Sequence, residues 1–192
     1  MLVSGRVRLR ALERSDLPSL VRWFNDPATR ALLARSSPMS LAEEERWFEG
    51  LLKSTSDAVF AIEELTTSTP RLIGCCGVHR IDWRNRNGSL GIVIGEVSDR
   101  GQGFGADAMT ALVRHCVADL GLYRVELEVI AGNDRALRTY ERVGFVVEGV
   151  RRGGIFKDGR FTDLVLMSML ASAVLPLPEG VAPPVPPKRK RS

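Results

Sequence analysis

The sequence predicts an α/β protein of one domain, built on a mixed sheet that carries helices on both faces. Its length of 192 residues is enough for a single domain with a sizeable core. An apolar content of 44% beside 26% charged residues is ordinary for a globular protein. Along the chain, strand-like and helix-like segments alternate before a final pair of strands. This order favours a mixed sheet covered by helices.

Strands are predicted where apolar and polar residues alternate. Val7, Leu9 and Ala11 alternate with three arginines, which indicates a strand with one buried face. A polar turn at 66–70 joins two further strands, and Lys-Asp-Gly-Arg at 157–160 indicates a hairpin turn between the last two. The predicted strands are 5–12, 58–65, 71–81, 89–94, 123–130, 145–150 and 161–170.

Helices are predicted from apolar spacing and from residues that cap helix ends. Ser40 and Glu43 form a capping box, and the helix after it would bury an apolar face. That face would consist of Leu41, Trp47 and Leu51. The other predicted helices are one capped by Asp16, one at 28–34, one opening at Phe104 with a buried stripe every four residues, and one capped by Asn133 and ended by Gly144. Loops join the helices between residues 16 and 52, which are expected to form a mobile flap over a site.

The charge of the chain is concentrated at its end. The formal net charge is +4, but four basic residues occupy 188–191 and Glu179 is the one acid in the last 22 residues. The remainder holds 23 basic against 22 acidic residues, so no nucleic-acid-binding face is expected. From residue 171 the composition is proline-rich, which favours extended polyproline II structure. We therefore predict a folded domain at 1–170 and a proline-rich basic tail at 171–192.

Cysteine and histidine content excludes several other classes. Three cysteines, Cys75, Cys76 and Cys116, are an odd number in a chain too large to need disulfides, so reduced thiols are expected. Two histidines provide no zinc-ligand spacing, so no metal is expected. The N-terminus lacks a signal-peptide core and no apolar run approaches a membrane span. A cytoplasmic protein without a membrane partner is predicted.

A glycine-rich turn carries the first functional signal. Its sequence is Arg100-Gly101-Gln102-Gly103-Phe104-Gly105, directly before a predicted helix. Three missing side chains expose backbone N–H groups at the positive end of the helix dipole, which suits a phosphate group. Arg100 adds a formal positive charge. A plain glycine-rich turn is the other interpretation, and the glycines alone do not separate the two.

Two phosphate-binding motifs fit the turn poorly. A Walker P-loop ends in Gly-Lys-Ser/Thr, which is absent here. Residues 101–106 satisfy the dinucleotide pattern G-x-G-x-x-G/A, and Glu126 or Glu128 could bind a ribose. However, residues 96–100 separate the strand from the glycines, and both acids lie in the middle of a strand. A nicotinamide dinucleotide is therefore a weaker hypothesis.

A second motif downstream points to a different ligand. From Asn133 the chain follows N-x-x-A-x-x-x-Y-x-x-x-G-F, and the turn follows Arg100-x-x-Gly103-x-Gly105. Together they resemble the GNAT superfamily of acetyltransferases, whose acetyl-CoA pyrophosphate motif is Q/R-x-x-G-x-G/A. The resemblance covers about 6–170. It implies a GNAT fold, with a mostly antiparallel central sheet that is splayed at the acetyl-CoA site.

Three further segments narrow the resemblance. They are Val7-Arg8-Leu9-Arg10, Trp23 to Pro27 and Pro38-Met39-Ser40. With the final hairpin, they are similar to the branch that contains ribosomal-protein and spermidine N-acetyltransferases. The resemblance implies that the chain uses acetyl-CoA as co-substrate and acetylates a primary amine by direct attack, and it makes a homodimer an expectation.

The resemblance also implies which residues bind acetyl-CoA. The strand end would hold the pantetheine arm through its backbone, and the amides of 100–105 would hold the pyrophosphate. Asn133 would contact the pantetheine and Tyr140 would stand near the thioester sulfur, about 10 Å further along one helix face. The implied binding residues are Ile92, Val93, Ile94, Arg100, Gly101, Gln102, Gly103, Phe104, Gly105, Asn133, Ala136 and Tyr140.

The catalytic groups are only partly implied. Tyr140 would protonate the departing thiolate of CoA, although packing on the sheet would also explain a tyrosine there. Ser89 stands where the family branch often has a glutamate, and it could order a water that takes the amine proton. Glu96, Asp99 and Glu128 are weaker substitutes for a base, and His79 could reach the site or simply pack.

The acceptor amine is not identified by the sequence. A protein N-terminus, a polyamine and an amino sugar all remain open. Acids in the predicted flap could attract a cationic amine, although a solvated helix face explains them as well; they are Asp26, Glu43, Glu44 and Glu45. An alternative function is a non-catalytic acyl-CoA-binding module on the same fold, which the absence of the strand glutamate favours and Tyr140 disfavours.

Overall fold

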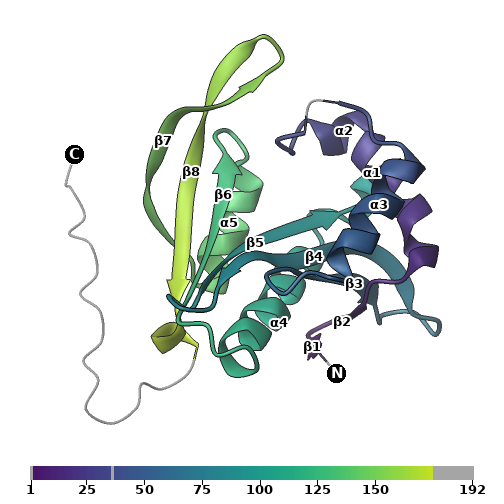
Figure 1. Ribbon diagram of the computed structural model, residues 1–192, viewed down its shortest axis with the longest axis horizontal. Helices are drawn as coiled ribbons and strands as arrows, with labels where there is room; N and C mark the ends of the chain where they lie inside the picture. The colour runs from purple at the N-terminus through teal and green to yellow at the C-terminus, as the bar shows by residue number, and fades with distance from the viewer. Residues whose placement is uncertain (1, 36, 175–192) are drawn as a thin grey trace.

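An eight-stranded sheet with helices on both faces forms the described part of the chain, as the prediction required (Figure 1). The computed structural model describes residues 2–35 and 37–174. Most of the predicted tail therefore lies outside the described residues. The strands are β1 (Leu2–Ser4), β2 (Val7–Ala11), β3 (Ala58–Glu64), β4 (Arg71–Asp82), β5 (Asn87–Ile94), β6 (Arg124–Ile130), β7 (Val146–Lys157) and β8 (Arg160–Leu170). The helices are α1 (Leu17–Asn25), α2 (Pro27–Arg30), α3 (Leu41–Leu51), α4 (Phe104–Ala118) and α5 (Asp134–Val143).

The sheet opens between β5 and β6. The strand order is β1-β2-β3-β4-β5-β6-β8-β7, and neighbours are antiparallel except β5 and β6. These two pair in parallel over three residues, Asn87–Ser89 with Arg124–Glu126. Beyond them, β5 continues along β4 and β6 continues along β8, and the two strands diverge (Figure 1). The predicted splay of a mostly antiparallel sheet is confirmed.

Helices α4 and α5 cover one face of the sheet with the larger hydrophobic core. Four of the five residues of the predicted α4 stripe are buried: Phe104, Ala108, Leu112 and Cys116. The fifth, Leu120, is half-buried and follows the end of α4 at Ala118. Apolar residues on α5 pack more loosely at the border of the same core. This layer fixes the start of α4, and with it the glycine turn, against the sheet.

Helices α1 and α3 cover the opposite face (Figure 1). Their buried side chains form a second core with β3 and β4. The buried members are Leu12, Leu17, Leu20, Trp23, Phe48, Ala61 and Cys75. The helices expected to form a flap therefore pack on the sheet through a core of their own, and residues of these helices and of their connections border the sheet opening.

Several predicted details of this helical region were wrong. Helix α2 spans Pro27–Arg30, shorter than the predicted 28–34. The carboxylate of Asp16 does not cap α1, because it accepts hydrogen bonds from Arg10 at 2.7 and 2.9 Å and from the amide of Glu13. In addition, β1 was not predicted, since three residues are too few to show a period.

The buried face of α3 also differs from the prediction. The capping box of Ser40 and Glu43 is confirmed, but Leu41 is 42% exposed and Trp47 39%. The buried residues of α3 are Glu44 and Phe48. The positions of α1 and β4 decide which face of α3 is covered, and this information does not lie within the helix itself.

The last two strands form a long hairpin at the edge of the sheet. Its predicted turn is confirmed, with Asp158 at φ 50° and Gly159 at φ 76° between Lys157 and Arg160. Strand β7 runs to Lys157, seven residues beyond the prediction. The Lys157 ammonium donates to the backbone carbonyls of Arg30 and Leu33, so the hairpin touches the α2 region across the sheet opening.

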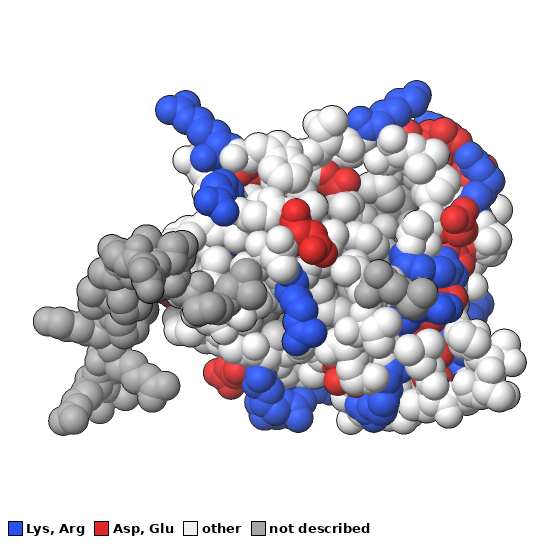
Figure 2. Space-filling view, turned by 90° about the horizontal axis from the view of Figure 1, so that it is seen from below, with Lys and Arg blue, Asp and Glu red and all other residues white. Residues whose placement is uncertain are grey.

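Charges are mixed on the surface. Basic and acidic side chains are interspersed on the face seen from below (Figure 2). All three cysteines are buried and unpaired, as predicted. In the described ranges, no helix is long and apolar enough to cross a membrane.

Candidate active site

A cavity of about 1210 Å³ lies where β5 and β6 diverge. Residues 90–94 of β5 and 127–130 of β6 form two of its walls. The glycine turn, helix α5 and the segment from α1 to α3 form the others. The two motifs singled out from the sequence, 33 residues apart, therefore border one cavity.

The glycine turn has the conformation that requires glycine. Gly101 has φ 80° and Gly103 φ 94°, in the left-handed region that other residues rarely adopt. Gly103 is the N-cap of α4, and a Cβ there would come within 2.5 Å of Nη2 of Arg6. At Gly101 an added Cβ would meet nothing within 4 Å, so that side of the turn is open.

The start of α4 presents backbone donors at this turn. The amides of Ala106 and Asp107 donate to the carbonyl of Gly103. The amides of Phe104 and Gly105 precede the first helical acceptors, as at any helix N-terminus. With the positive end of the dipole, they make a cradle that fits a phosphate group. The side chain of Gln102 points back to the carbonyl of Ser98 at 2.6 Å.

Arg100 acts mainly as an anchor. Its guanidinium donates to the carbonyls of Ile94 at 3.1 Å and Gly95 at 2.7 Å, and to the hydroxyl of Thr29 at 2.6 Å. It therefore joins the end of β5, the glycine turn and α2. Burial, with the nearby Arg135, lowers the pKa of Arg100. Sequence reasoning missed four further arginines that line the cavity: Arg35, Arg135, Arg138 and Arg142.

Helix α5 brings Asn133 and Tyr140 to the same cavity. The side-chain oxygen of Asn133 accepts a hydrogen bond from the amide of Ala136 at 3.2 Å, which confirms the predicted cap. The ring of Tyr140 packs edge-on against Phe145, with 5.9 Å between centroids. Burial raises the pKa of Tyr140 to about 12, so its hydroxyl keeps its proton and can donate it. Tyr140 thus both packs on the sheet and faces the cavity.

Ser89 lies at the last parallel pair between β5 and β6, next to the opening. It is in register with His79 on β4 and with Glu126 on β6. The cavity lining starts one residue later, at Leu90, and does not include Ser89. Its proposed role in ordering a water stays a prediction.

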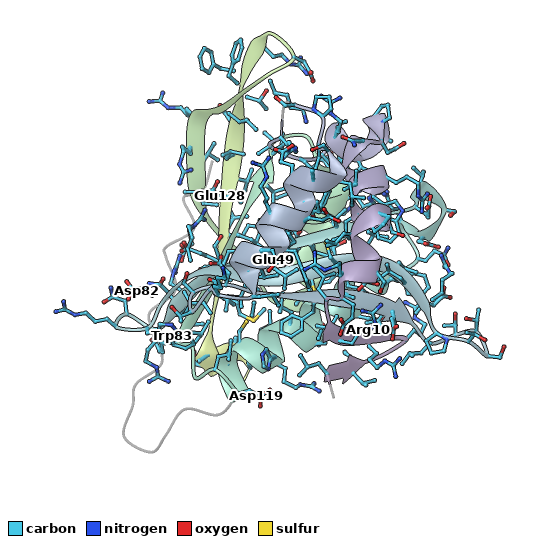
Figure 3. The ribbon with its side chains drawn as sticks, turned by 45° about the vertical axis from the view of Figure 1, so that its right-hand side comes forward. Arg10, Glu49, Asp82, Trp83, Asp119 and Glu128 are labelled. Carbon is cyan, nitrogen blue, oxygen red and sulfur yellow. The ribbon has the colours of Figure 1, made fainter. Side chains whose placement is uncertain are left out.

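The acids considered as substitutes for a base are already paired. Glu96 accepts from the indole of Trp23 at 2.8 Å and from Arg22. Asp99 is held by Arg71 at 2.9 Å. Glu128, labelled in Figure 3, forms an ion pair with Arg151 at 2.8 Å.

His79 is also paired, through Nδ1, with Asp57 at 3.2 Å. The His79 ring borders the cavity, together with Gly77 of the same strand. The three acids are therefore held by partners, whereas Nε2 of His79 has no hydrogen bond to any described residue and lies beside Gly77 and Gly91 of the cavity wall, so His79 stays a candidate base.

One acid of the cavity is different. Glu44 is only 2% exposed, and its Oε1 has no hydrogen-bond partner. Burial raises its pKa to about 7, with Arg35 opposing the shift and Glu43 adding to it. Sequence reasoning counted Glu44 among the acids of the flap but missed its burial. The signal was its position four residues before Phe48 and seven before Leu51 on one helix face.

The described residues contain no group of side chains that could bind a metal ion. Among residues 2–35 and 37–174, no group of three or more His, Cys, Asp or Glu side chains could hold a metal ion. The cavity wall offers backbone donors, five arginines, a histidine, a phenol and an unpaired, buried carboxyl.

Comparison with known proteins gives a family. A model described as an acetyltransferase (GNAT) domain matches residues 6–146. A spermidine N(1)-acetyltransferase of Vibrio cholerae is 26% identical over 173 residues, which are 90% of this chain and 98% of the relative. A putative ribosomal N-acetyltransferase of Bacillus subtilis is 32% identical over 99 residues, which are 52% of this chain and 54% of the relative.

A solved structure supports the same assignment. The crystal structure of a spermidine N-acetyltransferase from Vibrio cholerae, in complex with CoA and spermine, superposes with a TM-score of 0.81 at 26% identity. The superposition covers 87% of this chain and 96% of the other. These findings confirm the resemblance drawn from the two motifs.

Proposed function

The chain belongs to the GNAT family of acetyltransferases, and from this premise we propose that it transfers an acetyl group from acetyl-CoA to a primary amine. One observation carries the proposal. The glycine turn, the open edges of β5 and β6, and Tyr140 all border a single cavity.

The residues present fit acetyl-CoA in three places. The amides of Phe104 and Gly105 and the bare glycines would bind the pyrophosphate, with Arg135 near its charge. The backbone of 92–94 borders the opening where a pantetheine arm would lie. Asn133 uses its side-chain oxygen for the helix cap, so its amide nitrogen would make the ligand contact.

Tyr140 would act on the sulfur. Thiolate is a poor leaving group when its charge stays uncompensated in a partly apolar cavity, and the phenol of Tyr140 can donate a hydrogen bond or its proton to it. Burial raises the pKa of Tyr140 to about 12, so the phenol is protonated before the step, although it is a weaker acid than an exposed tyrosine. The acceptor would enter from the side of α1 to α3. A spermidine acetyltransferase and a putative ribosomal acetyltransferase among the relatives support an amine acceptor of either a polyamine or a protein N-terminus type.

Calorimetry with acetyl-CoA tests the donor half. Gly103→Val should abolish binding, because Val would need a φ of 94°, which a β-branched residue rarely adopts, and the turn would change shape. Gly149→Val is the matched control, since an added Cβ on β7 meets nothing within 4 Å. Wild-type protein that does not bind acetyl-CoA would refute the proposed function.

Turnover tests the catalytic half. Tyr140→Phe should lower kcat about 100-fold with little change in the affinity for acetyl-CoA. A thiol-release assay over a panel of amines measures it. The second candidate, a non-catalytic acyl-CoA-binding module, is supported by the absence of a strand glutamate at Ser89. Binding of acetyl-CoA without thiol release from any amine in the panel would favour it.

We also propose a homodimer formed through the final hairpin. Strand β7 is the last strand of the sheet, and four of the hairpin's apolar side chains are more than half exposed. They are Val146, Val150, Phe156 and Phe161. Sedimentation should give twice the mass of one chain, and a Phe156→Asp, Phe161→Asp double variant should give the mass of a single chain.

The unpaired cysteines fit a reducing compartment, so we place the enzyme in the cytoplasm. We assign residues 1–170 to the catalytic domain and 171–192 to a separate tail.

A further inference from the structure

Glu44 is a buried acid that lines the cavity from α3, on the side away from the sheet face that carries α4 and α5. It is 2% exposed, and its Oε1 has no hydrogen-bond partner. A buried polar atom without a partner costs free energy, and native proteins keep few of them. Such an atom at a cavity wall points to a ligand that completes its hydrogen bonding.

Few charged groups face this carboxyl. Arg35 and Glu43 are the charges that influence its ionisation, and they are already bonded to each other at 2.9 Å. On β4, the buried thiol of Cys75 lies near Glu44 and keeps its proton, because burial raises the pKa of Cys75 to about 12. Asp16 approaches the same thiol and is held by Arg10. No cation in the described residues therefore makes an ion pair with Glu44.

The other acids of the cavity are not equivalent to Glu44. Glu43, Asp99 and Glu128 each hold an arginine. Glu141 lines the cavity from α5 but is exposed to solvent. Among the described acids of the cavity wall, Glu44 alone is both buried and unpaired.

We propose that Glu44 receives the acceptor: its carboxylate binds one primary ammonium group and removes the proton that must leave before the amine attacks. The inference rests on the proposed acetyl transfer and assigns the role of base to Glu44, for which His79 with its unbonded Nε2 is the other candidate. A carboxyl that ionises near neutral pH suits a general base, since it can both take and release a proton at that pH.

The protons balance over one cycle. Glu44 takes a proton from the bound ammonium, and the neutral amine attacks the thioester carbonyl carbon to form a C–N bond. The C–S bond then breaks, and the CoA thiolate takes the proton of Tyr140. The Tyr140 phenolate recovers a proton from the nitrogen of the new amide, and Glu44 releases its own to solvent. One proton is released for each amide formed.

The walls near Glu44 indicate the class of acceptor. Phe24, Met39 and Trp47 border the same cavity, so the ammonium would enter beside apolar side chains. A polyamine needs several free carboxylates to bind its several charges, and most acids of this wall are already paired. We infer an acceptor with a single primary ammonium on an apolar body, unlike the polyamine in the name of the Vibrio cholerae relative.

The experiment compares wild type, Glu44→Gln and Glu44→Asp with the control Glu45→Gln, which removes the neighbouring charge on the same helix outside the cavity lining. The probes are n-butylamine and spermidine, measured by thiol release and, with CoA bound, by calorimetry. For Glu44→Gln we expect at least a 100-fold loss of kcat/KM for n-butylamine and at least a tenfold loss of its affinity. Glu44→Asp should recover part of both, and Glu45→Gln should change neither.

The pH profile separates catalysis from a structural role. In wild type, kcat/KM for n-butylamine should rise with pH through about 7, as Glu44 ionises. Glu44→Gln should lose this inflection while keeping the wild-type affinity for acetyl-CoA, which also shows that the variant is folded.

Each adverse outcome has a distinct meaning. An unchanged profile and unchanged n-butylamine affinity in Glu44→Gln would overturn the inference and leave acetyl transfer intact. Wild type that binds spermidine but not n-butylamine would overturn the acceptor class. If the wild-type protein does not bind acetyl-CoA, the proposed function itself is refuted.

Discussion

Buried carboxylates occur in two settings in this molecule, the outer strands of the sheet and the cavity wall. Near β2 and β3, three buried acids each hold an arginine: Asp16 pairs with Arg10, Glu63 with Arg8 and Arg10, and Glu64 with Arg71. Arg71 also holds Asp99, a buried acid of the cavity wall. On α3, Glu44 is more deeply buried than any of them and holds none. The buried acids of the outer strands are therefore all paired, whereas the cavity wall holds one paired acid, Asp99, and one unpaired acid, Glu44.

The two settings respond to pH in opposite directions. Burial alone would raise the pKa of Asp16 and Glu63, but hydrogen bonds from Arg10 and Arg8 outweigh it and lower both. The folding stability that these two carboxylates contribute is present above their unfolded pKa values of about 4. It is lost as the pH falls through their lower pKa values in the folded protein. For Glu44 the folded pKa is raised from 4.5 to about 7. The contribution of Glu44 to folding stability is therefore fully present below pH 4.5, and it is lost as the pH rises to about 7.

The largest effect should follow from removing a shared arginine. Arg10 lies where β2 leads into the first helices (Figure 3). Arg10→Met keeps the side-chain length but leaves Asp16 and part of Glu63 uncompensated, so we expect a loss of about 3 kcal/mol in the free energy of unfolding. Urea denaturation at pH 7 measures it. If the free energy of unfolding fell by less than about 1 kcal/mol, the ion pairs of Arg10 would gain little more than the cost of removing their charges from water.

The second prediction reverses the sign. Glu44→Gln should stabilise the protein at pH 8 by about 3 kcal/mol, the equivalent of the rise in pKa from 4.5 to about 7, and should change little at pH 4. Urea denaturation at both pH values, with Glu45→Gln as control, tests this. Equal effects at the two pH values would show that packing and not ionisation is responsible. Stability gained together with activity lost would identify Glu44 as a group kept for function.

These two settings also show where sequence reasoning succeeds. The stripe of α4, the cap at Asn133, the capping box at Ser40 and the hairpin turn were predictable, because each depends on residues within a few positions of one another. The glycine turn and the helix capped by Asn133, to which we assign the binding of acetyl-CoA, were predictable for the same reason, since each motif is local. The meeting of the two motifs at one cavity depends on the sheet between them. It was predicted from the family resemblance and not from the motifs themselves.

The acceptor side depends on contacts between distant segments. Glu44 looked like a surface acid among Glu43 and Glu45. Its spacing to Phe48 and Leu51 was a signal of burial within α3, but the covering of that face by α1 and β4 depends on the rest of the fold. Arg100 looked like a charge for the phosphate, yet the carbonyls at the end of β5 bind its guanidinium. In both cases the backbone of another element determines what the side chain does.

A smaller effect should come from the helix that carries Glu44. Ser40 accepts a hydrogen bond from the amide of Glu43 at 3.2 Å, which caps α3. Ser40→Ala should cost about 1 kcal/mol in the free energy of unfolding. Because the start of α3 also positions Glu44, the affinity for n-butylamine should fall by a few-fold. An unchanged affinity would show that packing of Phe48, and not the cap, holds Glu44 in place.

The smallest effect should come from an exposed acid on the same helix. Glu49, labelled in Figure 3, pairs with Arg14 at the surface, where both side chains are about half exposed. Glu49→Gln should change the free energy of unfolding by less than about 0.5 kcal/mol, and less still in 0.5 M salt, because solvent and ions screen such a pair. Urea denaturation at pH 8 in low and high salt measures the change. Glu44→Gln and Glu49→Gln remove the same charge from one helix and differ in burial. If Glu49→Gln stabilised the protein as much as Glu44→Gln, both effects would come from the net charge of α3. Burial would then not explain why the two settings differ.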